Sequence, residues 1–155
     1  MKIAIASDHR GFRLKKQIAV YLQENGYSYL DFGTLSDEAV DYPDFAFSAA
    51  QAVAGGEYAL GILCCGTGVG VSIVANKVPG IRAANCSDPF SARLSREHND
   101  ANMLTLGERV LGCGLALEVL AAFLQGRYLG GRHACRVEKI KEIEAKYLGR
   151  TETER

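Results

Sequence analysis

The sequence predicts an α/β fold in which a five-stranded parallel sheet is covered by helices on both faces. Two observations lead to this prediction. Five apolar runs of strand length alternate with stretches of helical periodicity, and Gly, Asp or Pro bounds the runs. Strands separated by helices form βαβ units, and such crossovers produce a parallel sheet that is buried on both faces.

The elements follow one another in a regular order. The expected strands are KIAIAS (2–7), YSYLDFG (27–33), YALGILC (58–64), IRAANCS (81–87) and NMLTLGE (102–108). The helical patterns span residues 11–25, 43–54, 69–78, 89–97, 112–126 and 135–148. The first helix ends at Asn25-Gly26, because glycine readily adopts the conformation that terminates a helix. Since no repeat or linker is visible, we expect one domain over residues 1–149 and an unstructured tail over residues 150–155.

The composition and the charge balance argue against several classes of protein. The chain has 18 basic and 18 acidic residues, so nucleic acid is disfavoured as a partner and any anion site must be local. The N-terminal apolar run is too short for a signal peptide or a membrane span, and we expect a cytoplasmic protein with no membrane partner. The five cysteines lack metal-binding spacing, so we interpret them as reduced thiols that hold no metal.

Ligands of such sheets bind beyond the carboxyl ends of the strands, so the residues after each strand are the first candidates. Asp8, His9 and Arg10 follow the first strand. A dinucleotide site needs glycines there, because the backbone must approach a pyrophosphate, and NAD is therefore disfavoured. Asp8 either caps the next helix or takes part in chemistry, and its position alone leaves both interpretations open.

The third strand runs into the segment LGILCCGTGVGVS (60–72). Glycines at 66, 68 and 70 allow a sharp turn that points several amides into one concavity, which makes an anion cradle. A P-loop would need a Lys-Ser/Thr pair, and a Cys-x5-Arg phosphatase loop would need Arg at 70 or 71, but the chain has Gly70 and Val71. A cradle without lysine suits one small negative charge that develops during a reaction, as in an oxyanion hole.

Cys64 and Cys65 enter this loop together. Neighbouring strand residues face opposite sides of a sheet, so one of the two thiols is expected to pack in the core. The other thiol, at the mouth of the loop, would face aligned amides that favour the thiolate, which is a nucleophile or a base. A single buried cysteine is more often an inert small hydrophobe, and the adjacent cradle favours the reactive interpretation.

Two further groups of residues are candidates for chemistry. His98 and Asn99 precede the fifth strand and Arg109 follows it, and an imidazole has a pKa suited to carrying protons. Arg132 and Arg136 are four residues apart, which places them on one face if a helix starts there. They form either a solvated basic turn or, together with Arg109, a bidentate grip on a phosphate.

Taken together, these motifs resemble the ribose-5-phosphate isomerase B family, within a wider group that includes galactose-6-phosphate isomerase subunits. The resemblance rests on SDHRGF near the start, DYPDFA (41–46), AGGEYALGILCCGTGVGVSIVANKVPGIRAA (54–84), SREHNDANMLTLGERV (95–110) and GGRHACRVEKI (130–140). It implies a three-layer, Rossmann-like fold and a homodimer or tetramer with active sites between subunits. It also implies interconversion of ribose 5-phosphate and ribulose 5-phosphate without a metal or an organic cofactor.

The resemblance further implies roles for individual positions. Cys65 corresponds to the family's base, Thr67 to its assisting hydroxyl, and His98 to the acid that opens the sugar ring. The oxyanion cradle corresponds to loop amides that include those of Gly66, Gly68, Val69 and Gly70. Substrate contacts fall on Asp8, His9, Tyr42 and Asn99, and phosphate ligands fall on Arg109 and, from a neighbouring subunit, on Arg132 and Arg136.

One branch of the family replaces the cysteine by a glutamate just after the glycine loop, where this chain has Val71. Valine cannot remove a proton, so the chain groups with the cysteine users. The alternatives are an isomerase of the same mechanism for six-carbon sugar phosphates such as galactose or allose 6-phosphate, a non-catalytic sugar-phosphate-binding module, and a redox switch on Cys64 and Cys65. Adjacent cysteines are poorly placed for a disulfide, which disfavours the switch.

Overall fold

The computed structural model describes residues 1–147, which form a parallel sheet between two layers of helices. The strands are β1 (Lys2–Ser7), β2 (Ser28–Asp31), β3 (Leu60–Cys65), β4 (Ala83–Asn85) and β5 (Met103–Gly107), in the order β2-β1-β3-β5-β4. The helices are α1 (Phe12–Glu24), α2 (Tyr42–Ala54), α3 (Val69–Ala75), α4 (Pro89–Asn99), α5 (Cys113–Gln125) and α6 (Ala134–Tyr147). A 3₁₀ turn over Gly131–His133 precedes α6.

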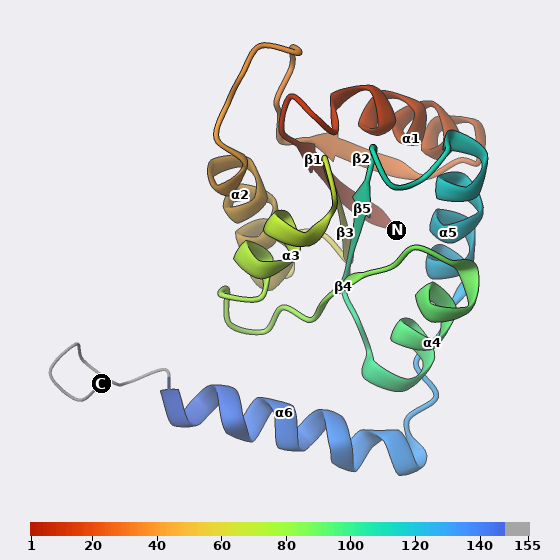
Figure 1. Cartoon of the computed structure of the whole chain (residues 1–155). Coiled ribbons are helices and arrows are strands. Elements are labelled where there is room, and N and C mark those ends of the chain that lie inside the picture. Colours follow the sequence, from red (N-terminus) through yellow and green to blue (C-terminus); the bar gives the residue numbers. More distant parts are fainter. Residues whose placement is uncertain (148–155) are drawn as a thin grey trace, which may run out of the picture.

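Figure 1 shows α2 and α3 on one face of the sheet and α1, α4 and α5 on the other. All four strand pairings are parallel. The predicted three-layer α/β fold is therefore confirmed. The predicted tail over residues 150–155 lies outside the described residues, and so do the expected last residues of the domain.

The ends of several elements differ from the predicted ones for local reasons. β3 extends to Cys65, because that residue still pairs in register with Gly107 of β5. α3 ends at Ala75 rather than at residue 78. The next residue, Asn76, turns its side chain to the carbonyl of Ala83 and donates a hydrogen bond of 2.9 Å. β4 is confined to three residues, since the amide of Arg82 before it donates to the Asn102 side chain at 2.8 Å rather than to a strand.

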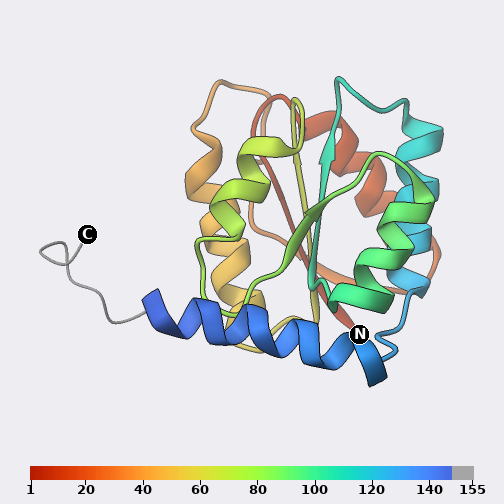
Figure 2. The same cartoon turned by 60° about the horizontal axis from the view of Figure 1, so that its bottom comes forward.

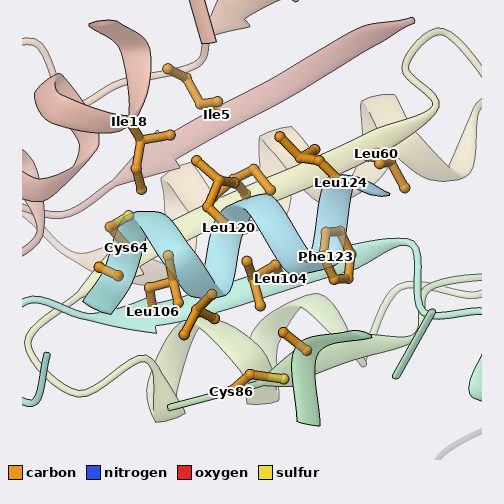
Figure 3. Close-up of a cluster of buried hydrophobic side chains, with 14 of the residues drawn as sticks. Ile5, Ile18, Leu60, Cys64, Cys86, Leu104, Leu106, Leu120, Phe123 and Leu124 are labelled. Carbon is orange, nitrogen blue, oxygen red and sulfur yellow. The ribbon is translucent and has the colours of Figure 1, made fainter. Parts of the chain in front are cut away.

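Alternate residues of the central strands supply two separate cores. One core packs beneath α1 and α5 and includes Ile5, Cys64 and Leu106, which lie close to Ile18 and Leu120 in Figure 3. The other packs beneath α2 and α3 and is built largely from alanines and valines, together with Cys65, Leu63 and Met103. Removing these apolar surfaces from water is the main force that holds the helices on the sheet.

The parallel arrangement gives the sheet two chemically different edges. All strands end at the edge from which α1, α3 and α5 depart, and we call this the carboxyl edge. Figure 2 shows α6 running across the opposite, amino edge, where the strands begin. Among residues 1–147, no helix has the length and apolar character needed to cross a membrane.

Candidate active site

Cys65 is the last residue of β3 and lies at the carboxyl edge with 5% of its surface exposed. Its Sγ accepts a hydrogen bond of 3.1 Å from the amide of Gly68. Hydrogen bonds of this kind are stronger when the acceptor carries a negative charge. The sulfur is thus held at the mouth of the glycine loop, beside backbone donors.

Cys64 faces the opposite side of the sheet and is fully buried. Figure 3 places it in the apolar core between α5 and the sheet. Burial, and secondarily the neighbouring Cys65, raises the pKa of the Cys64 thiol far above its usual range. Cys64 is therefore a neutral core residue, which is the division of roles that strand alternation predicts for this pair.

The glycine loop after β3 is packed tightly against the ends of β4 and β5. Gly68 has a φ of +79°, and a Cβ there would lie 2.4 Å from Oδ1 of Asn85. A Cβ on Gly107, at the end of β5, would lie 2.6 Å from the carbonyl carbon of Thr67. The loop is therefore held closely between the ends of β4 and β5, with the Thr67 hydroxyl accepting from the Val69 amide at 3.3 Å.

Asp8 closes the turn between β1 and α1. Its Oδ1 accepts from the amides of Arg10, at 2.9 Å, and Gly11, at 3.0 Å. The N-cap of α1 is Gly11 and not Asp8, so the interpretation of Asp8 as the cap is wrong. The first-turn amide of Leu14 is bound by Oε2 of Glu108 at 2.9 Å. Because Asp8 uses one carboxylate oxygen in this turn, the second oxygen is available for another contact.

His9 is oriented by the loop that leads into α2. Its Nδ1 accepts a hydrogen bond of 3.2 Å from the amide of Val40. A neutral imidazole carries one proton, so Nδ1 as the acceptor assigns that proton to Nε2. His9 therefore presents an N–H donor on the side away from Val40, which is suited to a hydroxyl or phosphate oxygen.

Tyr42 and Arg109 complete the residues at this edge. Tyr42 begins α2, and its ring lies so close to Gly70 that a Cβ on the glycine would be 2.9 Å from ring carbon Cζ. The Arg109 amide donates to the carbonyl of Gly66 at 3.0 Å, which joins the loop after β5 to the glycine loop. We call the residues gathered here the carboxyl-edge cluster: Asp8, His9, Tyr42, Cys65, Gly66, Thr67, Gly68, Val69, Gly70 and Arg109.

The other predicted site residues form a second group at the amino edge. The rings of His98 and His133 stack with their centroids 4.0 Å apart. Nε of Arg132 donates to Nε2 of His133 at 3.4 Å, and Arg136 follows in the first turn of α6. Burial, then the positive charges of His98, Arg132 and Arg136, lowers the pKa of His133. We call His98, Asn99, Arg132, His133 and Arg136 the amino-edge cluster.

Arg82 holds the end of α4, where His98 and Asn99 lie. Its Nε donates to the carbonyls of Asn99, at 3.2 Å, and Asp100, at 2.9 Å. Its Nη2 also pairs with the Asp100 carboxylate at 2.9 Å. Asp100 adopts a φ of +49°, which is uncommon for a residue with a side chain, and these bonds hold it there. The hydrogen bonds and the ion pair of Arg82 thus stabilise the amino-edge cluster, although Arg82 itself is not part of it.

A single chain does not bring the two clusters together. They are separated by the length of the sheet, roughly 16 Å for five residues at about 3.3 Å each. His98 and Asn99 lie at the end of α4 and precede β5, as the sequence predicts. The sequence places Arg132 and Arg136 on one helical face only if a single helix contains both. This condition is not met, because Arg132 lies in the 3₁₀ turn and α6 begins at Ala134.

Sequence reasoning missed several residues that support the site. Glu108 was visible as an acid directly after a buried strand, but its contact with Leu14 joins positions far apart in the chain. Lys15 is 1% exposed and donates to Asp31 Oδ1 and the Thr34 carbonyl, both at 2.6 Å. A lysine within an amphipathic helix carries no sequence signal of burial. Within residues 1–147, no group of three or more His, Cys, Asp or Glu is placed to hold a metal ion.

Comparisons with known proteins identify the family of the chain. A family model described as "Ribose/Galactose Isomerase" matches residues 3–140. The chain is 55% identical to ribose-5-phosphate isomerase B of Escherichia coli over 143 residues, which cover 92% of this chain and 96% of the relative. The structure of Clostridium thermocellum ribose-5-phosphate isomerase B has a TM-score of 0.94 and 58% identity, and the match covers 95% of this chain and 99% of that one.

A further solved structure contains a ligand. Ribose-5-phosphate isomerase B from Mycoplasma genitalium was solved with bound ribulose 5-phosphate, and it matches with a TM-score of 0.90 and 41% identity. That match covers 94% of this chain and 97% of the other. From the sequence match over most of the chain, and from the fold, it follows that the chain belongs to the ribose/galactose isomerase family.

Proposed function

We propose that the chain interconverts ribose 5-phosphate and ribulose 5-phosphate through an enediolate intermediate. The observation that carries the proposal is the 3.1 Å hydrogen bond from the Gly68 amide to Cys65 Sγ, which sets a proton acceptor beside a glycine loop. Membership of the ribose/galactose isomerase family supports it, as does the ligand of the Mycoplasma genitalium relative.

In the proposed reaction, Cys65 acts as a thiolate and removes the proton from C2 of the open-chain aldose. The electron pair of that C–H bond forms the C1–C2 double bond, and negative charge develops on O1. The thiol then returns its proton to C1, the proton on O2 passes to O1, and the C2 carbonyl of the ketose forms. General-base action of this kind contributes roughly 10²–10⁴-fold.

The glycine loop would stabilise the enediolate. Backbone amides over residues 66–70 lie next to Cys65, and loss of one such oxyanion donor typically costs about 10²–10³-fold. The hydroxyl of Thr67 would assist proton transfer. His98 would act as the acid that opens the furanose ring, while Asp8, His9, Tyr42 and Asn99 would contact the sugar.

We further propose that the active site is shared between two copies of the chain. The carboxyl-edge cluster has the base but lacks the ring-opening acid and two of the proposed phosphate ligands, which lie at the far edge of the same chain. A second copy that presents its amino-edge cluster, with Arg132 and Arg136, to the carboxyl-edge cluster would complete the site. In a two-fold dimer this contact occurs twice, so both sites are complete.

Features of α6 support such a dimer. A cavity of about 940 Å³ lies between α6 and the body of the chain, and its lining includes Arg82, Asn99 and Ile140. Ile140, Ile143 and Tyr147 are exposed along this helix. Apolar surface of this kind at the rim of an incomplete site favours a second copy as its cover.

The direct test is isomerisation in deuterated water. Purified protein is incubated with ribose 5-phosphate, and deuterium is followed into C1 of the ribulose 5-phosphate. Parallel rates with galactose 6-phosphate and allose 6-phosphate establish the preferred chain length. Turnover with label at C1 supports the proposal, whereas phosphate-ester binding without turnover or label would leave a non-catalytic binding module.

A further inference from the structure

We infer that Arg10 is an additional phosphate ligand, acting beside Arg109 at the carboxyl-edge cluster. The inference rests on the proposed function for the identity of the ligand, a sugar phosphate. Arg10 directly follows Asp8 and His9, yet its side chain crosses to the next loop. Its Cδ and Cβ lie 3.6 Å and 3.8 Å from the point that a Cβ on Gly66 would occupy.

Arg109 approaches the same glycine from the loop after β5, the strand that flanks β3 on the side away from β1. Its Cδ lies 3.8 Å from that same point, and its amide donates to the Gly66 carbonyl. The aliphatic parts of two arginine side chains, one after β1 and one after β5, therefore both pack against Gly66, which has no side chain. Both stems lie at ordinary van der Waals distance from the place that a Gly66 side chain would take.

Neither guanidinium group forms an ion pair with a side chain within residues 1–147. The side-chain ion pairs of residues 1–147 use other cations, which are Lys15, Arg82, Arg93, Arg96 and Lys141. The Asp8 carboxylate accepts from two backbone amides, and Glu108 accepts from the amide of Leu14. Like charges at neighbouring positions repel, so an anion that binds both is favoured.

A phosphate dianion meets this requirement better than the other parts of the proposed substrate. The hydroxyls and the carbonyl of a sugar are neutral, whereas an arginine fork can donate two parallel hydrogen bonds to a phosphate. Arg10 and Arg109 would bind the phosphate from one chain, and Arg132 and Arg136 of the second copy would bind it from the other. Arg10 is thus a binding residue and takes no part in proton transfer.

The experiment compares Arg10→Ala with Arg13→Ala. Arg13 is an exposed arginine on α1, three residues further on, and it forms none of the ion pairs of residues 1–147. We expect Arg10→Ala to raise the KM for ribose 5-phosphate and the inhibition constant of inorganic phosphate by a similar factor, roughly tenfold for one charged hydrogen-bonding group. For Arg10→Lys, both constants should lie between those of the wild type and those of Arg10→Ala. For Arg13→Ala, both constants should equal those of the wild type.

A thermal-shift titration with inorganic phosphate separates this inference from the proposed function. Phosphate should raise the Tm of the wild type and of Arg13→Ala more than that of Arg10→Ala, whether or not the wild type is active. Equal phosphate responses in the two variants, with an active wild type, would overturn the role of Arg10 alone. An inactive wild type that keeps the Arg10-dependent response would instead reject the isomerase and retain the anion site.

Discussion

The imidazole rings of His98 and His133 lie parallel, with an interplanar angle of 7° and centroids 4.0 Å apart. His133 lies in the 3₁₀ turn beside Arg132, and its pKa is lowered by burial and then by the positive charges of His98, Arg132 and Arg136. A positive charge on the stacked His98 ring therefore disfavours protonation of His133. The neutral form of His133 is therefore favoured beside His98, the proposed ring-opening acid.

Replacing His133 by Gln should reduce the loss of stability in acid. The folded chain disfavours protonated His133, so the unfolded chain binds more protons there. Stability is therefore lost as the pH falls from the ordinary histidine value of 6.5 through the lowered pKa. Between about pH 7.5 and about pH 5, the Tm of His133→Gln should fall less than that of the wild type. An equal fall in both proteins would contradict the assigned direction.

Cys65→Ala should remove most of the isomerase turnover while sugar-phosphate binding persists, because the proposed base is lost and the loop remains. Cys64→Ala should retain turnover and lower the free energy of unfolding by roughly 1–2 kcal/mol, because it removes a buried sulfur from the core. Turnover and chemical denaturation are measured on both variants. The same residual activity in the two variants would refute the assignment of the base.

Arg136→Ala should raise the KM strongly, since it removes a proposed phosphate ligand. Mixing it with inactive Cys65→Ala should restore part of the activity, because a mixed dimer would contain one site with both groups intact. Subunit exchange is verified separately by mass spectrometry of the mixture. Exchange without recovery of activity would argue against a site shared between copies.

Gly68→Ala should abolish most turnover and destabilise the fold, because its Cβ would meet the Asn85 side chain and the backbone of Leu106. Gly26→Ala is the matched control. Gly26 also has a positive φ, +73°, but no atom lies within 4 Å of its Cβ position. Gly26→Ala should therefore lower the free energy of unfolding only by the conformational strain of a side chain at positive φ, about 1–2 kcal/mol. Similar activity losses in the two variants would show that strain, and not loop packing, is responsible.

Arg82→Gln should lower kcat more than it raises KM, because it loosens the end of α4 that presents His98. Arg82→Lys keeps one donor and should recover part of the loss. Arg93→Gln is the control, since it removes an exposed i,i+4 ion pair on the same helix, which is worth at most about 0.5 kcal/mol. Pre-steady-state ring-opening rates distinguish positioning from general destabilisation. A fall in Tm without a change in kcat would limit Arg82 to a structural role.

The fold class and the division of Cys64 and Cys65 between the two faces of the sheet could be predicted from the sequence because both depend on local patterns. Strand alternation separates Cys64 from Cys65 wherever the sheet lies, and the glycines at 66, 68 and 70 permit a tight turn by themselves. The exact ends of β4 and α3 escaped prediction. They depend on bonds from the side chains of Asn76 and Asn102, whose partners come from other elements.

Local sequence patterns indicated which residues are candidates for chemistry, and tertiary structure decided where those residues lie. The His98–His133 stack joins positions in α4 and in the turn before α6, and the Arg10–Arg109 approach over Gly66 joins three loops. α4 runs from the carboxyl edge back to the amino edge, so it carries His98 away from Cys65 of its own chain. Contacts of this kind arise from packing between distant segments, which the spacing of residues along the chain does not encode.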